Sequence, residues 1–303
     1  MPETGPLAAT LARLDAADDA CTYVAGDPGE ADGTGWCRLD EALGDGRVLD
    51  RWFRTLLEGE GNWWRDVTGE LLAYYLPNVI ADSATKALVD ERRVWPIAAE
   101  HLAVRHAPQG SFDGIAVRAS RLRVLPGDPD ADHPDVSAVT DEAALRTVLL
   151  DELIPLLTSI FAEVRRRSPY GVRGMWGNFA DGIAIAALWR VRRHGTEADA
   201  RAAFATAMAL IDELAARVPL SKVRPHLERV PWSGGTGWIA IKGTCCLLYK
   251  SRARVGPEAH RRGVTVDFEI DAEDNGYCPL CPFLEDGEHR VASAYWLEKA
   301  AKA

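Results

Sequence analysis

The sequence predicts an α+β fold that is mostly helical, with a small antiparallel sheet and a cysteine-rich segment near the C-terminus. Apolar residues recur at helical spacing in two long stretches, 47–91 and 140–214. Two short segments within 101–125 instead alternate apolar and polar residues, as half-buried strands do. With 303 residues, of which 47% are hydrophobic and 26% charged, the chain is long enough to bury a substantial core.

The N-terminal elements are predicted to be a helix and a strand. Pro6 suits the first turn of a helix, because its missing N–H has no helical partner there in any case. Leu7, Leu11 and Leu14 follow at helical spacing and would form the apolar stripe of this helix. Residues 21–25 then predict a short strand.

The middle of the first half is predicted to contain a long helix and a pair of strands. The helical pattern covers 47–91, and Pro77 is expected to break or bend it because proline clashes with the preceding turn. Residues 101–106 and 115–125 flank a turn and predict antiparallel strands. The acidic stretch 127–135 is interrupted by prolines and is interpreted as a solvated linker.

This linker suggests a division of the chain into two parts. Residues 1–135 would form an N-terminal α/β portion, and residues 136–303 a helical layer followed by the C-terminal cysteine segment. Within the second part, helices are predicted at about 140–167, 176–194 and 196–214.

Four of the six cysteines lie in two short pieces that follow a predicted strand. Cys245 and Cys246 are adjacent, while Cys278 and Cys281 form a Cys-x-x-Cys turn. Such a turn directs two thiolates at one metal or cluster, whereas adjacent strand residues point to opposite faces unless the backbone kinks. Gly243 would supply the conformational freedom for that kink.

The residue chemistry of these pairs leaves several interpretations open. A [2Fe-2S] cluster needs two thiolates on each iron, which an adjacent pair supplies more readily than it completes the tight tetrahedron of a single zinc ion. Structural zinc, a redox dithiol and small buried cysteines on a core strand are the alternatives. Cys21 and Cys37 flank a loop rich in Gly and Asp and are interpreted as free thiols.

Two runs of residues carry a resemblance to a known family. Cys-Cys-Leu-Leu-Tyr-Lys at 245–250, followed by Tyr-Cys-Pro-Leu-Cys-Pro-Phe at 277–283, resembles the C-terminal iron–sulfur motif of the FhuF-type ferric siderophore reductases. Met-Trp-Gly-Asn-Phe-Ala-Asp at 175–181 is similar to the Trp-x-Asn segment upstream of the cluster in that family. The resemblance implies a C-terminal [2Fe-2S] cluster segment with four ligands: Cys245, Cys246, Cys278 and Cys281. One departure is the connection between the two cysteine pairs, which is much longer than usual in the family.

The function implied by the resemblance is one-electron reduction of a ferric siderophore, for example of the hydroxamate type, with release of ferrous iron. The electron would come from a ferredoxin- or flavoprotein-like donor. Docking of siderophore or donor is expected at six residues: Arg252, Arg254, Arg261, Arg262, Trp176 and Asn178. For the arginines the alternative is a solvated surface, and for the other two it is core packing and helix capping. A zinc-binding structural or interaction protein with a four-cysteine site is the alternative function.

Charge and hydropathy restrict the partners and the compartment. The formal net charge of −10 argues against nucleic acid and anionic membranes, since both favour a basic surface. No apolar run approaches the length of a bilayer span, and the N-terminus lacks the basic start of an export signal. We therefore expect a cytoplasmic protein that works as a monomer, in a reducing compartment where structural disulfides would not account for the cysteines.

Overall fold

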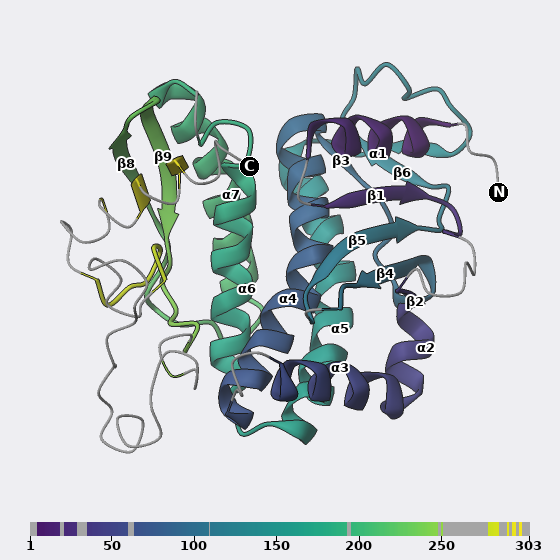
Figure 1. The fold of residues 1–303 in the computed structure, drawn as a ribbon. Coiled ribbons are helices and arrows are strands. Elements are labelled where there is room, and N and C mark those ends of the chain that lie inside the picture. Colours follow the sequence, from purple (N-terminus) through teal and green to yellow (C-terminus); the bar gives the residue numbers. More distant parts are fainter. Residues whose placement is uncertain are drawn as a thin grey trace. The chain divides into compact units, whose positions relative to one another are not determined.

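The computed structural model has a mostly helical fold with small sheets (Figure 1). The residues that the structure describes are 5–18, 21–28, 35–59, 64–108, 110–192, 195–247, 250, 278–284, 290, 293–294 and 297–298. They contain seven α-helices and three sheets, and the structure is 53% helical. The α+β class predicted from the sequence is therefore confirmed.

The chain divides into two compact units, each built from two stretches of sequence. Unit 1 comprises Met1–Thr55 and Tyr75–Arg166, and unit 2 comprises Leu56–Tyr74 and Arg167–Ala303. The boundary expected at residue 135 falls inside unit 1. The four cysteines of the C-terminal motif all belong to unit 2, together with a stretch from the first half of the chain.

The elements up to residue 167 are mostly those of unit 1. The helices are α1 (Pro6–Ala17), α2 (Leu39–Gly44), α3 (Gly46–Glu58), α4 (Arg65–Lys86), the π-helix η1 (Ala87–Glu91), the 3-10 helix η2 (Ala99–His101) and α5 (Glu142–Arg167). The strands are β1 (Thr22–Ala25), β2 (Trp36–Arg38), β3 (Arg93–Val94), β4 (Leu102–His106), β5 (Phe112–Val117), β6 (Leu122–Val124) and β7 (Val136–Ala138).

These strands form two small mixed sheets. One has the order β1-β5-β4-β2, with β1 parallel to β5 and the other pairs antiparallel. The predicted antiparallel pairing is confirmed for β4 and β5, with Val104 opposite Ile115. The second predicted strand, 115–125, is however divided: β5 ends at Val117, and residues 122–124 form β6 in the other sheet. The other sheet has the order β3-β6-β7.

Helix α1 begins and packs as its sequence predicts. Pro6 is its first residue, and the Thr10 hydroxyl donates a hydrogen bond of 2.8 Å to the Pro6 carbonyl. Leu7, Leu11 and Leu14 are all buried. The apolar stripe at i, i+4 and i+7 therefore faces the core of unit 1.

Two sequence expectations for this part of the chain are corrected in part. Helix α4 continues through Pro77, so the predicted break does not occur. The stretch 127–135 is exposed or half-buried, as expected of a solvated linker, but the Asp128 side chain is only 8% exposed and accepts a hydrogen bond of 2.7 Å from Arg93. Arg93 is itself 4% exposed, so its charge needs a carboxylate partner.

Unit 2 packs two helices beside a hairpin, as Figure 1 shows for α6, α7, β8 and β9. The elements are α6 (Val172–Ala187), α7 (Glu197–Ala215), β8 (His226–Trp232) and β9 (Gly235–Ile241). Helix α7 starts at a capping box in which Thr196 and Asp199 exchange side-chain and backbone hydrogen bonds. Helix α6 ends at Ala187, before the predicted end near 194.

The hairpin carries the small apolar core of this part of unit 2. Val230 on β8 packs with Ile239 and Ile241 on β9 and with Leu297. Strand β9 then ends directly before Lys242, so the core residues hold the base of the cysteine segment in place. No helix within the described part of the chain is long and apolar enough to cross a membrane.

Candidate metal centre

The first cysteine segment is held by a carboxylate from helix α6. Asp181 is 1% exposed, and its two oxygens accept hydrogen bonds of 2.7 Å from the Gly243 amide and 2.9 Å from the Thr244 amide. Burial raises the pKa of the Asp181 carboxyl to about 7, although both amide bonds oppose this rise. Asp181 therefore anchors the turn that places Cys245 and Cys246.

Two glycines allow close packing around this turn. A Cβ on Gly177 of α6 would lie 2.1 Å from the Thr244 hydroxyl oxygen, and a Cβ on Gly243 would lie 2.8 Å from the Val223 carbonyl oxygen. Gly243 is thus needed for space, and not for the kink that the sequence suggested. The left-handed residue is Leu247, with a φ of 54°, directly after the cysteine pair.

The sulfurs meet across the two segments. Cys246 Sγ lies 3.7 Å from Cys278 Sγ, and Cys245 interacts in the same way with Cys281. Cys246 donates to Cys278, which lowers the pKa of Cys278 to about 2 and raises the pKa of Cys246. The interaction with Cys281 likewise lowers the pKa of Cys245 and raises that of Cys281. Two interactions thus join the adjacent cysteines to the Cys-x-x-Cys turn, and a third links Cys278 and Cys281 within the turn.

The Cys-x-x-Cys turn is tied to the end of β9. The Cys281 amide donates to the Cys278 carbonyl at 2.9 Å, which closes the turn. The Lys242 amide donates to the Leu280 carbonyl at 3.0 Å and links the turn to the first segment. The Ser293 hydroxyl donates to the Pro279 carbonyl at 3.1 Å. The two segments, 32 positions apart at Cys246 and Cys278, therefore form one site in unit 2.

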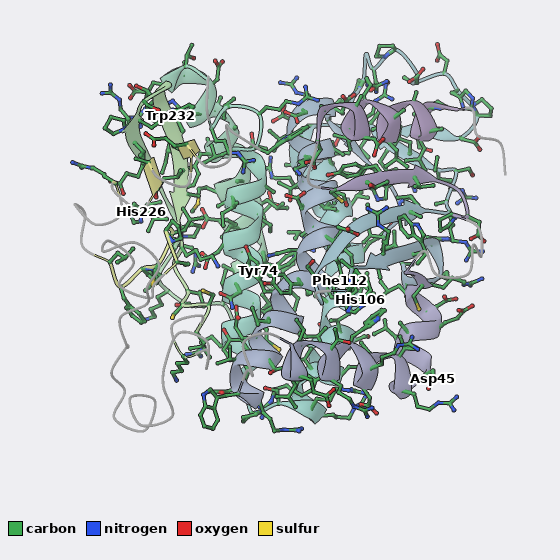
Figure 2. The ribbon with its side chains drawn as sticks, in the orientation of Figure 1. Asp45, Tyr74, His106, Phe112, His226 and Trp232 are labelled. Atoms are coloured by element: carbon green, nitrogen blue, oxygen red, sulfur yellow. The ribbon has the colours of Figure 1, made fainter. Side chains whose placement is uncertain are left out.

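Beside the cysteines lies a group of residues that we call the buried polar cluster: Glu70, Asn178 and Lys242, which are buried, and Tyr74, which is half-buried. Glu70 and Tyr74 come from α4, Asn178 from α6, and Lys242 from the end of β9; Tyr74 is labelled in Figure 2. The Asn178 amide donates to Glu70 Oε1 at 2.8 Å and to the Tyr170 hydroxyl at 2.9 Å. The Lys242 ammonium lies 4.3 Å from the centre of the Tyr74 ring.

Two atoms of this cluster are buried without a hydrogen-bond partner among the described residues. They are Glu70 Oε2 and Asn178 Oδ1. Burial raises the pKa of the Glu70 carboxyl well above its ordinary range. The pKa of Lys242 is also raised: burial opposes this, but Tyr74, Cys246 and Cys278 outweigh it. Both shifts act in the same sense: the raised pKa values favour a charged lysine and a neutral carboxyl in this cluster.

The structure places the expected docking residues differently. Trp176 and Asn178 are 2% and 0% exposed, and Trp176 packs edge-on against Phe179. Both therefore make interior contacts, as the core alternative describes. The four arginines expected to dock a partner, Arg252, Arg254, Arg261 and Arg262, lie outside the described residues.

Sequence reasoning missed Glu70, Tyr74, Asp181 and Lys242 as parts of the site. A signal existed for two of them, because Lys242 opens the cysteine motif and Asp181 closes the Met-Trp-Gly-Asn-Phe-Ala-Asp segment. A third signal is an isolated acid, Glu70, in an otherwise apolar helical run. Which of these residues contact one another could not be recognised without the fold.

The donor set suits a thiolate-ligated metal centre. Two thiolates bound at about 2.3 Å to one tetrahedral metal lie about 3.8 Å apart, which matches the separation of Cys246 Sγ and Cys278 Sγ. Among the described side chains, no group of three or more His, Cys, Asp or Glu is arranged to hold a single metal ion. No family model matches the chain, and the search of curated proteins finds no match.

Proposed function

We propose that the protein is a ferric siderophore reductase whose Cys245, Cys246, Cys278 and Cys281 hold a [2Fe-2S] cluster. The observation that carries this proposal is the cross-segment pairing of the sulfurs, with Cys246 and Cys278 at 3.7 Å. Two thiolate pairs from two short segments are the ligand set that a two-iron cluster takes. The siderophore as substrate rests on the resemblance of the two cysteine runs and of residues 175–181.

When bound, such a cluster supplies a one-electron carrier. An electron from a ferredoxin- or flavoprotein-like donor would pass to the Fe³⁺ of the siderophore and give Fe²⁺. Reduction releases the metal because Fe²⁺ binds hard oxygen ligands more weakly than Fe³⁺ does. No proton transfer or nucleophile is required for this step.

The chain's own residues then have defined tasks. The four cysteines bind as thiolates, and the low pKa of Cys278 favours that form. Asp181 orients the turn before Cys245 through its two amide bonds. Cys246 and Cys281 are 8% and 1% exposed, so the packing around them excludes water from one side of the site.

Metal analysis of the intact protein tests the cofactor. After anaerobic purification we expect a red-brown protein with about two irons and two sulfides per chain. Serine at any of the four cysteines should remove both. Cys21→Ser and Cys37→Ser are matched controls that should leave the visible spectrum unchanged, since these residues lie in unit 1. A colourless protein with stoichiometric zinc would overturn the proposal in favour of a zinc-binding protein.

A single-turnover assay tests the substrate. The chemically reduced protein is mixed anaerobically with a ferric trihydroxamate, and a ferrous chelator reports the released Fe²⁺. We expect loss of the reduced cluster spectrum and formation of the ferrous complex at a one-to-one ratio of electrons to iron. A reduced protein that keeps its spectrum beside the ferric complex would contradict the assignment of the substrate.

The docking of a partner by the arginines is part of the same proposal. They form a basic group in a chain of net charge −10 and are tethered between the two cysteine segments. Replacing Arg252, Arg254, Arg261 and Arg262 by Gln should slow reduction by an acidic donor through the association rate and flatten its salt dependence. Stopped-flow kinetics across a salt series would measure both. Unchanged rates and slope would identify the group as an ordinary solvated surface.

A further inference from the structure

Lys242 is a buried cation beside the cysteines. It is 6% exposed, and its ammonium lies 4.3 Å from the centre of the Tyr74 ring. Glu70 is the acid nearest to it in the buried polar cluster, but Glu70 Oε1 accepts from Asn178 and Glu70 Oε2 has no partner among the described residues. The carboxylate therefore does not neutralise the lysine through an ion pair.

A buried ammonium needs a compensating negative charge, since its transfer out of water costs several kcal/mol. The Tyr74 ring offers only a partial one, of about 1–2 kcal/mol. Among the other acidic groups, Asp181 already accepts hydrogen bonds from the Gly243 and Thr244 amides, whereas Cys246 and Cys278 act on Lys242 electrostatically. Lys242 is tied to both of their segments: it precedes Cys245 by three positions, and its amide donates to the Leu280 carbonyl between Cys278 and Cys281.

We propose that Lys242 is a positioning residue whose ammonium is the fixed countercharge of the thiolate site. This inference rests on the proposed function for its effect on electron transfer. Four thiolates give a metal centre a net negative charge, and reduction adds one more negative charge. A fixed cation beside the site stabilises the reduced form more than the oxidised form, and therefore raises the reduction potential.

Tyr74 has a supporting part in this arrangement. Its ring holds the ammonium in place without adding a full negative charge that would cancel its effect. A carboxylate in the same position would form a neutral pair with Lys242 and remove most of the field at the cysteines. The protonated state of Glu70, which burial favours, preserves the unpaired charge in the same way.

A redox titration of the loaded protein against dyes of known potential tests this. In Lys242→Met, which keeps the unbranched side chain up to the Cε position and removes the charged terminal nitrogen, we expect full iron and sulfide content. The ratio of reduced to oxidised protein at a fixed potential should fall at least about tenfold, which corresponds to 59 mV for one electron. Lys242→Arg should stay within about threefold of the wild type, because the charge is retained.

Lys250→Gln is the matched control. Lys250 follows the same cysteine pair, but its side chain is 35% exposed and lies 4.0 Å from Asp66. Solvent and the carboxylate screen its charge, so the ratio should change less than about threefold. An unchanged ratio in fully loaded Lys242→Met would overturn the inference, as would an equal fall in Lys250→Gln.

If Lys242→Met takes up no cluster, the cluster content of the variants becomes the test of the inference. Native far-UV circular dichroism with an empty site in Lys242→Met, beside full loading in Lys242→Arg, supports the countercharge. An empty site in Lys242→Arg as well would show that only the packing of lysine matters and would overturn it.

The role of Lys242 can be tested even if the proposed reductase function is wrong. If the wild type carries zinc, the reductase proposal fails, but a zinc ion with four thiolates is also net negative. Lys242→Met should then lose zinc to a chelator at about tenfold lower chelator concentration than the wild type. Equal retention of zinc in the two proteins would overturn the role of Lys242.

Discussion

Cys246 faces Cys278 across the site, with the two sulfurs 3.7 Å apart. Cys245 interacts with Cys281. The left-handed Leu247 turns the chain away immediately after the pair, so both sulfurs remain at the site. A feature that looks awkward in the sequence, two adjacent cysteines, thus serves to supply one sulfur to each pair.

Mild oxidation of the metal-free protein should report this pairing. We expect disulfides between Cys246 and Cys278 and between Cys245 and Cys281, because these sulfurs already lie side by side. Peptide mapping by mass spectrometry identifies the bonds, and Cys246→Ser should abolish the first of them. A predominant bond between Cys245 and Cys246 would contradict the arrangement.

Asp181 is the residue on which the first cysteine segment depends. Asp181→Ala would leave two buried amides without an acceptor, so we expect the free energy of unfolding to fall by about 2 kcal/mol or more. Asp181→Asn keeps one acceptor and should lose less. Urea unfolding of the metal-free protein measures the change. Asp212→Ala is the control, since the Asp212 side chain is 69% exposed and should matter by less than about 0.5 kcal/mol. A loss in Asp181→Ala as small as in the control would show that the amides find other acceptors.

At the scale of elements, the site is the meeting point of three of them. Strand β9 delivers the chain to Lys242, helix α6 contributes Asn178 and Asp181, and helix α4 contributes Glu70. The close approach of α6 to the turn at Thr244 requires a glycine, Gly177, on the helix face. Regular elements therefore position the loop that holds the cysteines.

Gly177→Ala tests this approach. In an exposed helix the change would be favourable by about 1 kcal/mol, but here the new Cβ would lie 2.1 Å from the Thr244 hydroxyl oxygen. We expect a net loss of about 1–3 kcal/mol in the free energy of unfolding, measured by urea titration. Gly44→Ala is the control, because no atom lies within 4 Å of its added Cβ. A stabilised Gly177→Ala would show that the turn is not packed against α6.

At the scale of the whole molecule, we expect stability to depend on pH through a half-buried imidazole in unit 1. His106 stacks on Trp52 at 5.6 Å and contacts Phe112 edge-on at 5.2 Å; Figure 2 labels His106 and Phe112, which lie on neighbouring strands. Burial lowers the pKa of His106 to about 4, and Arg51 adds to this while Asp113 opposes it. The folded protein therefore resists protonation of a group that the unfolded chain protonates near pH 6.5.

The sign of the pH effect follows from this difference. A lowered folded pKa means that the contribution of His106 is fully present above about pH 6.5 and is lost as the pH falls toward 4. We expect a loss of about 1 kcal/mol between these values, after allowance for solvent screening of a half-buried ring. His106→Phe should remove this part of the slope in urea unfolding at pH 7 and pH 4.5. His226→Gln, an exposed position, is the control. If the free energy of unfolding falls equally between pH 7 and pH 4.5 in the wild type and in His106→Phe, groups other than His106 cause the pH effect.

Much of the fold is predictable because its signals are local. The stripe of Leu7, Leu11 and Leu14 and the cap at Thr196 each depend on residues within a few turns of one helix. The continuation of α4 through Pro77 was missed because neighbouring structure outweighs the local cost of proline. The buried partner of Arg93 was missed because Asp128 lies 35 positions away.

By itself, the sequence determined the α+β class and the helices with clear periodicity, and it singled out the four cysteines as a candidate site. The tertiary structure alone decided which sulfur faces which and what surrounds them. Asn178 meets Glu70 across 108 positions, and Gly243 meets Asp181 across 62. Such contacts leave no periodic trace in the chain, because periodicity records only which face of an element is buried. The partner that covers that face, and the charge left beside the cysteines, follow from packing.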